Sequence, residues 1–345
     1  MLIVIGVLIG FIALLTLSFW ISYYILKKKK AQILFIDQNK VKDPRYFGKS
    51  FSKMMEQVGS DFTRGYVQLS EKEKICMVLE NSFNEDDYKK IVVCKSRGIT
   101  NIPKYINFSK EVYISNDAKI LGENTLHSLY ANGELIIESN INVVRWVDAK
   151  GKITVGDHCN LGISTTSEKS LEVGCDCHFH RLYAPVMILG CEKGCIFSTN
   201  EIIVNYVLSF KVERSNIKRN IKYVTDDMVD KNGVIPFTII TARNLVVTEN
   251  MIIIGDIRSD KGVKLCEGSI VCGNVFSEDN IFIGKNVMVI GTIFTQGSVI
   301  IEDGAIVGRK GEIRSIIARE SISINGMVKI YGYISCEKGG TIKEE

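Results

Sequence analysis

The densest group of side chains with chemical potential is a short cysteine and histidine segment. Its members are Cys175, Cys177, His178 and His180, followed by Cys191 and Cys195. Cysteine and histidine are the usual ligands of Zn²⁺, so these residue types taken alone predict a zinc site. A tetrahedral site built from Cys175, Cys191, Cys195 and one histidine is feasible if the chain bends near Pro185.

The spacing of the surrounding residues favours a structural role for the same segment. Ile141, Cys159 and Cys177 follow one another at intervals of 18 residues in an apolar column. Cys177 is therefore expected to point inward as a small hydrophobe. His178 and His180 then point outward, because successive side chains of a strand alternate between its faces. Ligands on opposite faces do not converge without a bulge, so we expect no metal and no cofactor.

Sequence signatures of catalysis are weak elsewhere in the chain. There is no GxxxxGK[ST] phosphate loop and no GxSxG nucleophile elbow. A left-handed hexapeptide-repeat acyltransferase needs strict period six and a histidine base. The glycine intervals here are irregular, and only four histidines are present. The sequence therefore predicts no catalytic residue and a protein that is not an enzyme.

The column of Ile141, Cys159 and Cys177 belongs to a first array of 18-residue repeats. A second array of repeats follows nearer the carboxyl end. The pentapeptide Gly-x-Ile/Val-x-Ser/Thr occurs at residues 255–259, 273–277, 291–295 and 311–315, with a looser copy from Gly332. Its starting points are spaced 18, 18, 20 and 21 residues apart. The loosened spacing after Gly308 indicates an insertion at residues 309–312.

Two arrays with an 18-residue period predict an all-β fold, a parallel β-helix (β-solenoid) of about 18 residues per turn. Each turn is expected to pair with the turns above and below at roughly 4.8 Å. We place the first array at residues 111–200 and the second at 246–345. Residues 201–245 are interpreted as an insertion that projects from the coil, and residues 31–110 as a mixed juxtamembrane segment without an assigned fold.

The amino end predicts a membrane anchor. Residues 2–26 contain no charged side chain, and a helix of roughly 20 residues spans a bilayer. Aromatic residues and then a lysine cluster end this segment, as expected at the cytoplasmic interface. The predicted anchor residues are Trp20, Tyr23, Tyr24, Lys27, Lys28, Lys29 and Lys30. We therefore expect an N-terminal transmembrane helix within residues 1–30, in a single-pass protein of the inner membrane whose carboxyl-terminal domain is cytoplasmic.

The charge balance limits the classes of partner. The chain has 43 basic and 39 acidic side chains, a net charge of +4, and the four consecutive lysines supply that excess. A nucleic-acid-binding domain would spread a basic excess over one face. We expect no nucleic-acid partner, and the ten cysteines fit a reducing compartment, where they remain thiols.

The second array resembles the bactofilin family of bacterial polymer-forming cytoskeletal proteins. The resemblance covers roughly residues 245–340, with the repeats that begin at Gly255, Gly273, Gly291 and Gly304. The resemblance implies a right-handed, three-faced β-helix that joins end to end into filaments without nucleotide. It also implies membrane association and a scaffold role in cell shape, in cell-wall enzyme placement or in polarity. The chain departs from the family pattern because another array precedes the bactofilin-like one.

The carboxyl-terminal end of the coil is the predicted contact between chains. The end of a solenoid exposes unpaired strand edges and core aliphatics unless a polar cap covers them. We expect Ile330, Tyr331 and Ile334 to mediate self-association. The alternative is a monomer in which residues 31–110 and the charged tail cover the two ends.

These observations lead to one functional hypothesis and two alternatives. The leading hypothesis is a membrane-anchored scaffold that polymerises with itself, contacts the lipid bilayer and positions cell-wall enzymes or other envelope proteins. One alternative is a membrane-tethered β-helical enzyme, an acyltransferase or lyase, that acts on envelope carbohydrate. The other is a monomeric adaptor that binds one partner through residues 190–250.

Overall fold

A computed structural model describes residues 43–58, 66–68, 74–79, 88–95, 98–190, 217–231 and 233–344, and also residues 6, 11, 15–17, 19–20 and 23. The chain divides into two compact units, Met1–Asp43 and Pro44–Glu345. The second unit contains helix α3 and every described strand. It is considered by itself below.

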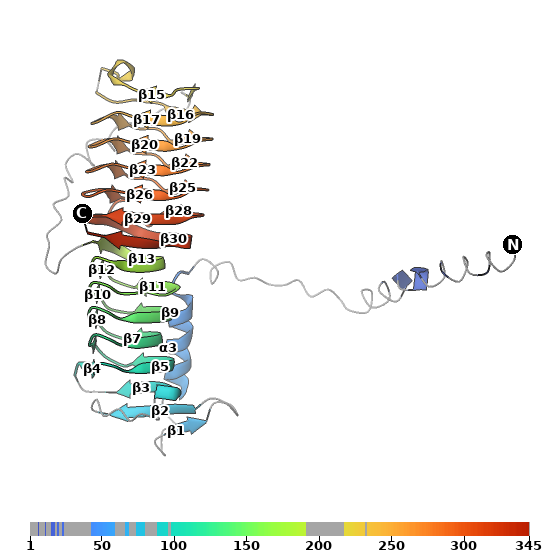
Figure 1. Cartoon of the computed structure of the whole chain (residues 1–345), viewed down its shortest axis with the longest axis vertical. Coiled ribbons are helices and arrows are strands. Elements are labelled where there is room, and N and C mark those ends of the chain that lie inside the picture. The colour runs from blue at the N-terminus through green and yellow to red at the C-terminus, as the bar shows by residue number, and fades with distance from the viewer. Residues whose placement is uncertain are drawn as a thin grey trace. The chain divides into compact units, whose positions relative to one another are not determined.

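The second unit is a β-solenoid of about 13 turns with about 18 residues per turn (Figure 1). Equivalent strands of successive turns pair in parallel, as in the register Leu135 with Ile153 and Ile153 with Leu171. The alternation of inward apolar and outward polar residues makes this pairing possible, because only the stack buries each turn's apolar face. The predicted all-β solenoid with parallel strands is confirmed.

The first array contains strands β1 to β13. Their bounds are β1 Tyr66–Gln68, β2 Lys74–Leu79, β3 Ile91–Lys95, β4 Thr100–Ile102, β5 Asn107–Ile114, β6 Ala118–Ile120, β7 Thr125–Ala131, β8 Leu135–Ile137, β9 Asn142–Ala149, β10 Ile153–Val155, β11 Ser164–Ser167, β12 Leu171–Val173 and β13 Cys177–Leu189. Parallel stacking begins where β2 pairs with β3. The coil therefore starts before residue 111, where the sequence pattern placed its beginning.

The second array contains strands β14 to β30. Their bounds are β14 Ile217–Arg219, β15 Tyr223–Val224, β16 Thr238–Thr241, β17 Leu245–Val247, β18 Ile252–Ile253, β19 Ile257–Ser259, β20 Val263–Leu265, β21 Ile270–Val271, β22 Val275–Ser277, β23 Ile281–Ile283, β24 Met288–Val289, β25 Ile293–Thr295, β26 Val299–Ile301, β27 Ile306–Val307, β28 Arg314–Ala318, β29 Ser321–Asn325 and β30 Val328–Lys343. A short 3-10 helix, Asp226–Met228, lies between β15 and β16. Residues 217–231 and 233–245 thus belong to the coil, so the predicted insertion is wrong for this part, where the exposed, charged β14 hides the repeat. Residues 201–216 of that predicted insertion lie outside the described residues.

The repeated pentapeptide has a physical explanation at one corner of the second array. The hydroxyl of Ser259 donates to the carbonyl oxygen of Arg243 at 2.8 Å and accepts from the backbone N–H of Lys261 at 3.1 Å. Ser277 and Thr295 repeat this arrangement one and two turns later. These buried hydroxyls satisfy backbone groups that the turn leaves without a ladder partner.

The fourth pentapeptide copy was aligned incorrectly. Ile293 pairs with Ile316, so the register advances by 23 residues and not by 20. The additional residues form a hairpin that carries an isolated bridge from Arg309 to Glu312, which agrees with the insertion expected at residues 309–312. Ile313, which the pentapeptide alignment placed inside, is 60% exposed.

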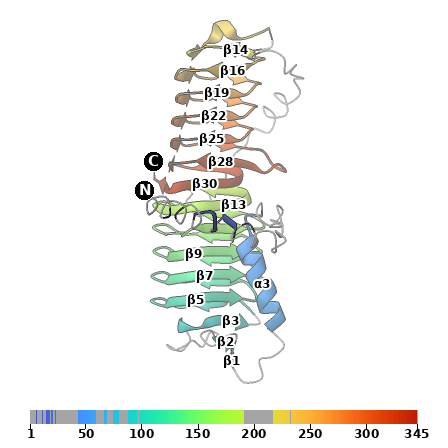
Figure 2. The ribbon, with the colours of Figure 1, turned by 90° about the vertical axis from the view of Figure 1, so that its right-hand side faces the viewer.

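Helix α3 (Tyr46–Val58) packs along the side of the first array (Figure 2). Its neighbours are β7 and β9. Residues Phe51 and Met55 are buried against the coil, whereas Tyr46 and Phe47 remain exposed. The helix therefore covers one outer face of the first array.

The predicted transmembrane anchor is corrected. Among the residues that the structure describes, no helix is long and apolar enough to cross a membrane. This finding contradicts both the N-terminal transmembrane helix within residues 1–30 and the assignment to the inner membrane as a single-pass protein. Trp20 and Tyr23 are described and exposed. Tyr24 and Lys27, Lys28, Lys29 and Lys30 lie outside the described residues.

Candidate functional site at the junction of the two arrays

The two arrays meet through their last turns. Strand β13, the end of the first array, pairs antiparallel with β30, the end of the second. The register joins Cys177 to Ile342, and Leu182 to Ile334. Figure 1 shows the consequence: the chain ascends through the first array, then returns through the second, so that both carboxyl-terminal turns lie at the middle of the stack.

The hydrophobic core is continuous across this junction. Leu182 and Met187 of β13 and Ile330 and Ile334 of β30 are fully buried within a single cluster that contains both arrays. Each array thereby covers the disc of aliphatic side chains and the strand edge at the other's end. Such surfaces otherwise favour association with another copy.

The junction contains the residues for which self-association was predicted. Ile330 lies opposite Met187, Ile334 lies opposite Leu182, and Tyr331 is buried in a smaller cluster beside Ile306. Their contacts are thus made within one chain. Association of two chains through these residues stays a prediction, and it requires the junction to open.

The cysteine and histidine segment also lies at the junction, on β13 and the turn before it. Cys159 and Cys177 are buried in consecutive turns, and the thiol of Cys177 donates to the carbonyl oxygen of Gly156 at 3.3 Å. His178 and His180 are exposed. The predicted inward cysteine column and outward histidines are therefore confirmed.

The metal alternative is limited by what the structure describes. Cys175 is half-buried, whereas Cys191 and Cys195 lie outside the described residues. Within the described part of the chain, no group of three or more His, Cys, Asp or Glu residues is arranged to hold a metal ion. Because two of its four candidate ligands lie outside the described residues, the zinc site stays a prediction.

A further cysteine at the junction was missed by the sequence analysis. Cys336 of β30 is buried, and its thiol donates to the carbonyl oxygen of His180 at 3.5 Å. Burial raises the pKa of Cys336 to about 11, so the group stays a neutral thiol near pH 7. The position of Cys336 at the junction follows from the pairing of β30 with β13, which no repeat spacing encodes.

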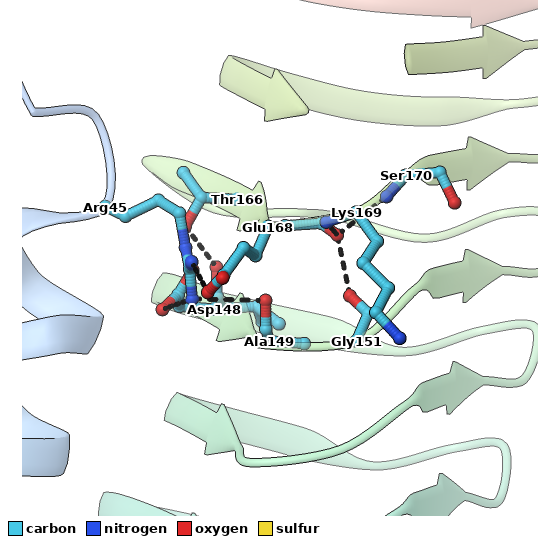
Figure 3. A network of polar contacts seen from close by, with 10 residues as sticks. Arg45, Asp148, Ala149, Gly151, Thr166, Glu168, Lys169 and Ser170 are labelled. Carbon is cyan, nitrogen blue, oxygen red and sulfur yellow. Dashed lines mark hydrogen bonds and ion pairs between the residues drawn. The ribbon is translucent and has the colours of Figure 1, made fainter. Parts of the chain in front are cut away.

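A second polar centre fixes α3 to the first array (Figure 3). The buried guanidinium of Arg45 donates from Nε to Oδ1 of Asp148 at 2.8 Å and from Nη2 to Oδ2 at 3.0 Å. Arg45 also contacts Glu168, and the hydroxyl of Thr166 donates to Asp148 Oδ1 at 2.6 Å. This bidentate geometry satisfies two charges that would be costly to bury separately.

The pKa shifts at this centre follow from burial and charge. Burial raises the pKa of Asp148, while the hydrogen bonds and charge of Arg45 oppose that rise. The hydrogen bond from Arg45 lowers the pKa of the more exposed Glu168. Burial opposes the charged form of Arg45, but the hydrogen bonds and negative charges of Asp148 and Glu168 favour it more strongly. The pKa of Arg45 is therefore raised, and the side chain remains a cation.

Aromatic side chains complete the contact of α3 with the coil. Phe51 packs edge to face on Trp146, with ring centroids 5.6 Å apart, and on Tyr113 at 6.3 Å. Tyr113 and Tyr130 stack at 5.5 Å in consecutive turns. Sequence reasoning missed this surface, although these tyrosines at 17-residue spacing occupy outward positions. Outward aromatics in register are the signal that the face is covered.

Comparison with known proteins adds no identification. No family model, no curated protein and no solved structure matches this chain. We therefore infer the function from the geometry of the junction and of the coil ends.

Proposed function

We propose that this chain is a non-enzymatic scaffold that assembles end to end and positions other proteins along its length, as the bactofilin-like repeats suggest. The observation that carries the proposal is the junction itself. Two coil ends already pair there, strand on strand, across a continuous apolar core. A fold whose ends join in this way within one chain is well suited to join in the same way between chains.

The outer ends of the stack are the surfaces available for such contacts. Strands β14 and β15 of the second array pair with β16 and β17 on one edge only, among the described strands. Ile217 and Tyr223 on these strands are 49% and 50% exposed. An unpaired edge with exposed apolar side chains supports strand addition by another copy.

The proposal is tested with the purified full-length chain by negative-stain electron microscopy and sedimentation velocity. We expect filaments or a ladder of oligomers whose size rises with concentration. The double variant Ile217→Asp/Tyr223→Asp should lower the oligomer mass to that of the monomer while the β-sheet circular dichroism signal is unchanged. Ile313→Asp, which places the same charge on an exposed hairpin away from this end, should assemble normally.

Two results would contradict the proposal. Monodisperse monomers across a wide range of salt and concentration would exclude assembly by the isolated chain. Assembly that survives the double variant unchanged would exclude the β14–β15 end as the contact.

A further inference from the structure

A pocket opens on the surface of the junction, beside the corner where the two last turns fall out of register. Phe179 pairs with Gly340, but the next pair is Arg181 with Ser335. A single residue of β13, His180, therefore lies opposite the four residues 336–339 of β30. Such bulges bend the strand locally and are over-represented next to active sites.

The pocket has a volume of about 560 Å³. This size lies within the range of small-molecule sites. Phe179 and Gly340 are among its lining residues; the Phe179 ring is buried against Gly340, and a Cβ on that glycine would overlap the ring. At the bulge, Gly339 has a φ of +101°, and a Cβ there would lie 3.5 Å from Cε1 of His180. Gly340 thus permits the buried packing beneath the pocket, and Gly339 permits the left-handed backbone of the bulge.

The charged and titratable side chains that line this pocket all have basic chemistry. They are His178 and His180 from the first array and Lys338 and Lys343 from the second. Hydroxyl and amide side chains complete the wall, contributed by Asn160, Ser321, Ser323 and Thr341. None of the described lining residues is a carboxylate.

Three acidic residues, Glu320, Glu337 and Glu344, are chain neighbours of lining residues, although none of them lines the pocket. Glu320, which does not line the pocket, forms an ion pair with Lys338, with 2.6 Å between Lys338 Nζ and Glu320 Oε1. Both side chains are largely exposed, so this pair is weak and can be shared with a stronger anion. Within the described residues, the side chains of His178, His180 and Lys343 form no hydrogen bond or ion pair with another side chain.

We propose that this pocket binds a small phosphorylated molecule through its phosphate group. Lysine ammonium groups make charge-assisted hydrogen bonds to phosphate oxygens, and imidazole N–H groups and serine and threonine hydroxyls supply further donors. Because the imidazoles come from the first array and the lysines from the second, the site exists only when the junction is closed. A bound ligand should therefore stabilise the closed junction by mass action. The inference does not depend on self-assembly.

The four histidines of the chain make a direct test practical. In the full-length protein, ¹H–¹³C spectra of the imidazole rings should show four resolved signals, which single His→Gln variants assign. Titration with pyrophosphate is expected to shift the ring signals of His178 and His180 to saturation and to leave those of His127 and His158 in place. Sodium chloride at matched ionic strength should shift none of them.

Matched variants sharpen the test. His178→Gln/His180→Gln should weaken pyrophosphate binding at least tenfold, measured by calorimetry. His158→Gln, an outward histidine on a turn before β13 that does not line the pocket, should leave it unchanged. Pyrophosphate should also slow alkylation of Cys336 by at least threefold, because that thiol becomes reactive only when the junction opens.

The possible ligand sources are separated by a second titration with adenosine diphosphate. Saturable binding of both probes with similar affinity indicates recognition of the phosphate alone, and binding of the nucleotide only indicates that the organic part is also recognised. Either result supports the site. Equal, non-saturating shifts of all four histidines, or no shift with either probe, would overturn it.

Discussion

The first and second arrays have the same 18-residue turn but are stabilised outside the core in different ways. One outer face of the first array is covered by α3, through the buried Arg45–Asp148 pair and the rings of Phe51, Tyr113 and Trp146. The second array instead has an open ladder in which Phe276 and Phe294 stack at 5.0 Å and Arg258 lies over Phe276. A regular coil therefore needs no helix, and α3 is a specific addition to the first array.

The arrays also differ at a left-handed corner. In the first array this corner is occupied by side-chain-bearing residues, namely Tyr105, Glu123, Asn140, His158 and Asp176. In the second array the same corner alternates between asparagine and glycine, the residues that most readily adopt a positive φ, namely Asn250, Gly268, Asn286 and Gly304. Glycine, asparagine and aspartate tolerate this conformation, whereas other residues are strained in it by roughly 1–2 kcal/mol. The first array thus carries strain at Tyr105, Glu123 and His158 that the second array avoids.

The largest effect is expected at the element that both arrays share. Ile334→Asp places a carboxylate in the fully buried core opposite Leu182. The free energy of unfolding should fall by more than about 4 kcal/mol, because the charge has no partner. Urea denaturation followed by circular dichroism measures this. Ile313→Asp on the exposed hairpin should change it by less than about 0.5 kcal/mol, and similar losses in both variants would argue against the junction.

A smaller effect, confined to the first array, is expected from Asp148→Ala. It leaves the Arg45 guanidinium buried without its bidentate partner, which costs about 3–5 kcal/mol. Hydrogen exchange should increase in α3, β7 and β9 while β19 to β26 keep their protection. Glu320→Gln, at an exposed ion pair, is the matched control. Equal deprotection of both arrays would show that α3 does not act locally.

The corner comparison predicts opposite signs in the two arrays. Gly304→Ala should destabilise the second array by roughly 1–2 kcal/mol, since φ is +73° and the new Cβ would overlap Asn286. His158→Gly should stabilise the first array by up to about 1 kcal/mol, because it relieves a φ of +57°. Thermal unfolding of the two variants measures both. The same sign for both changes would refute the difference in strain.

The smallest effect is a pH dependence at Glu168. Its pKa is lowered in the folded protein by Arg45, so its contribution is present above the unfolded value near 4.5 and is lost as pH falls through the lower folded pKa. The difference in unfolding free energy between the wild type and Glu168→Gln should be less than about 1 kcal/mol at pH 6, because the side chain is half exposed. It should vanish on acidification. Asp148 is present in both proteins, so its contribution cancels in this difference. A difference in unfolding free energy that widens at low pH would contradict the prediction.

The repeat unit was predictable from the sequence because its cause is local. Inward aliphatics and corner residues recur every 18 positions, so columns such as Leu135, Ile153 and Leu171 appear without a structure. The register after Gly308 was not predictable in detail, since a hairpin of variable length shifts the alignment without changing the residue types. The antiparallel junction was hidden for a different reason. It joins residues about 150 positions apart, such as Leu182 and Ile334, and no repeat spacing encodes that contact.

The central claim is that the two arrays meet end to end within one chain, and a cysteine pair across the junction tests it most directly. Arg181 and Ser335 are opposite each other in the β13–β30 register. Antiparallel partners lie about 4.5–5.5 Å apart at Cα, which suits a disulfide. Oxidation of Arg181→Cys/Ser335→Cys should give a bond between these residues within a monomer, identified by peptide mass spectrometry. Arg181→Cys/Ile317→Cys, one strand farther away, should not form it. A 181–335 bond found only between chains, or not at all, would contradict the account.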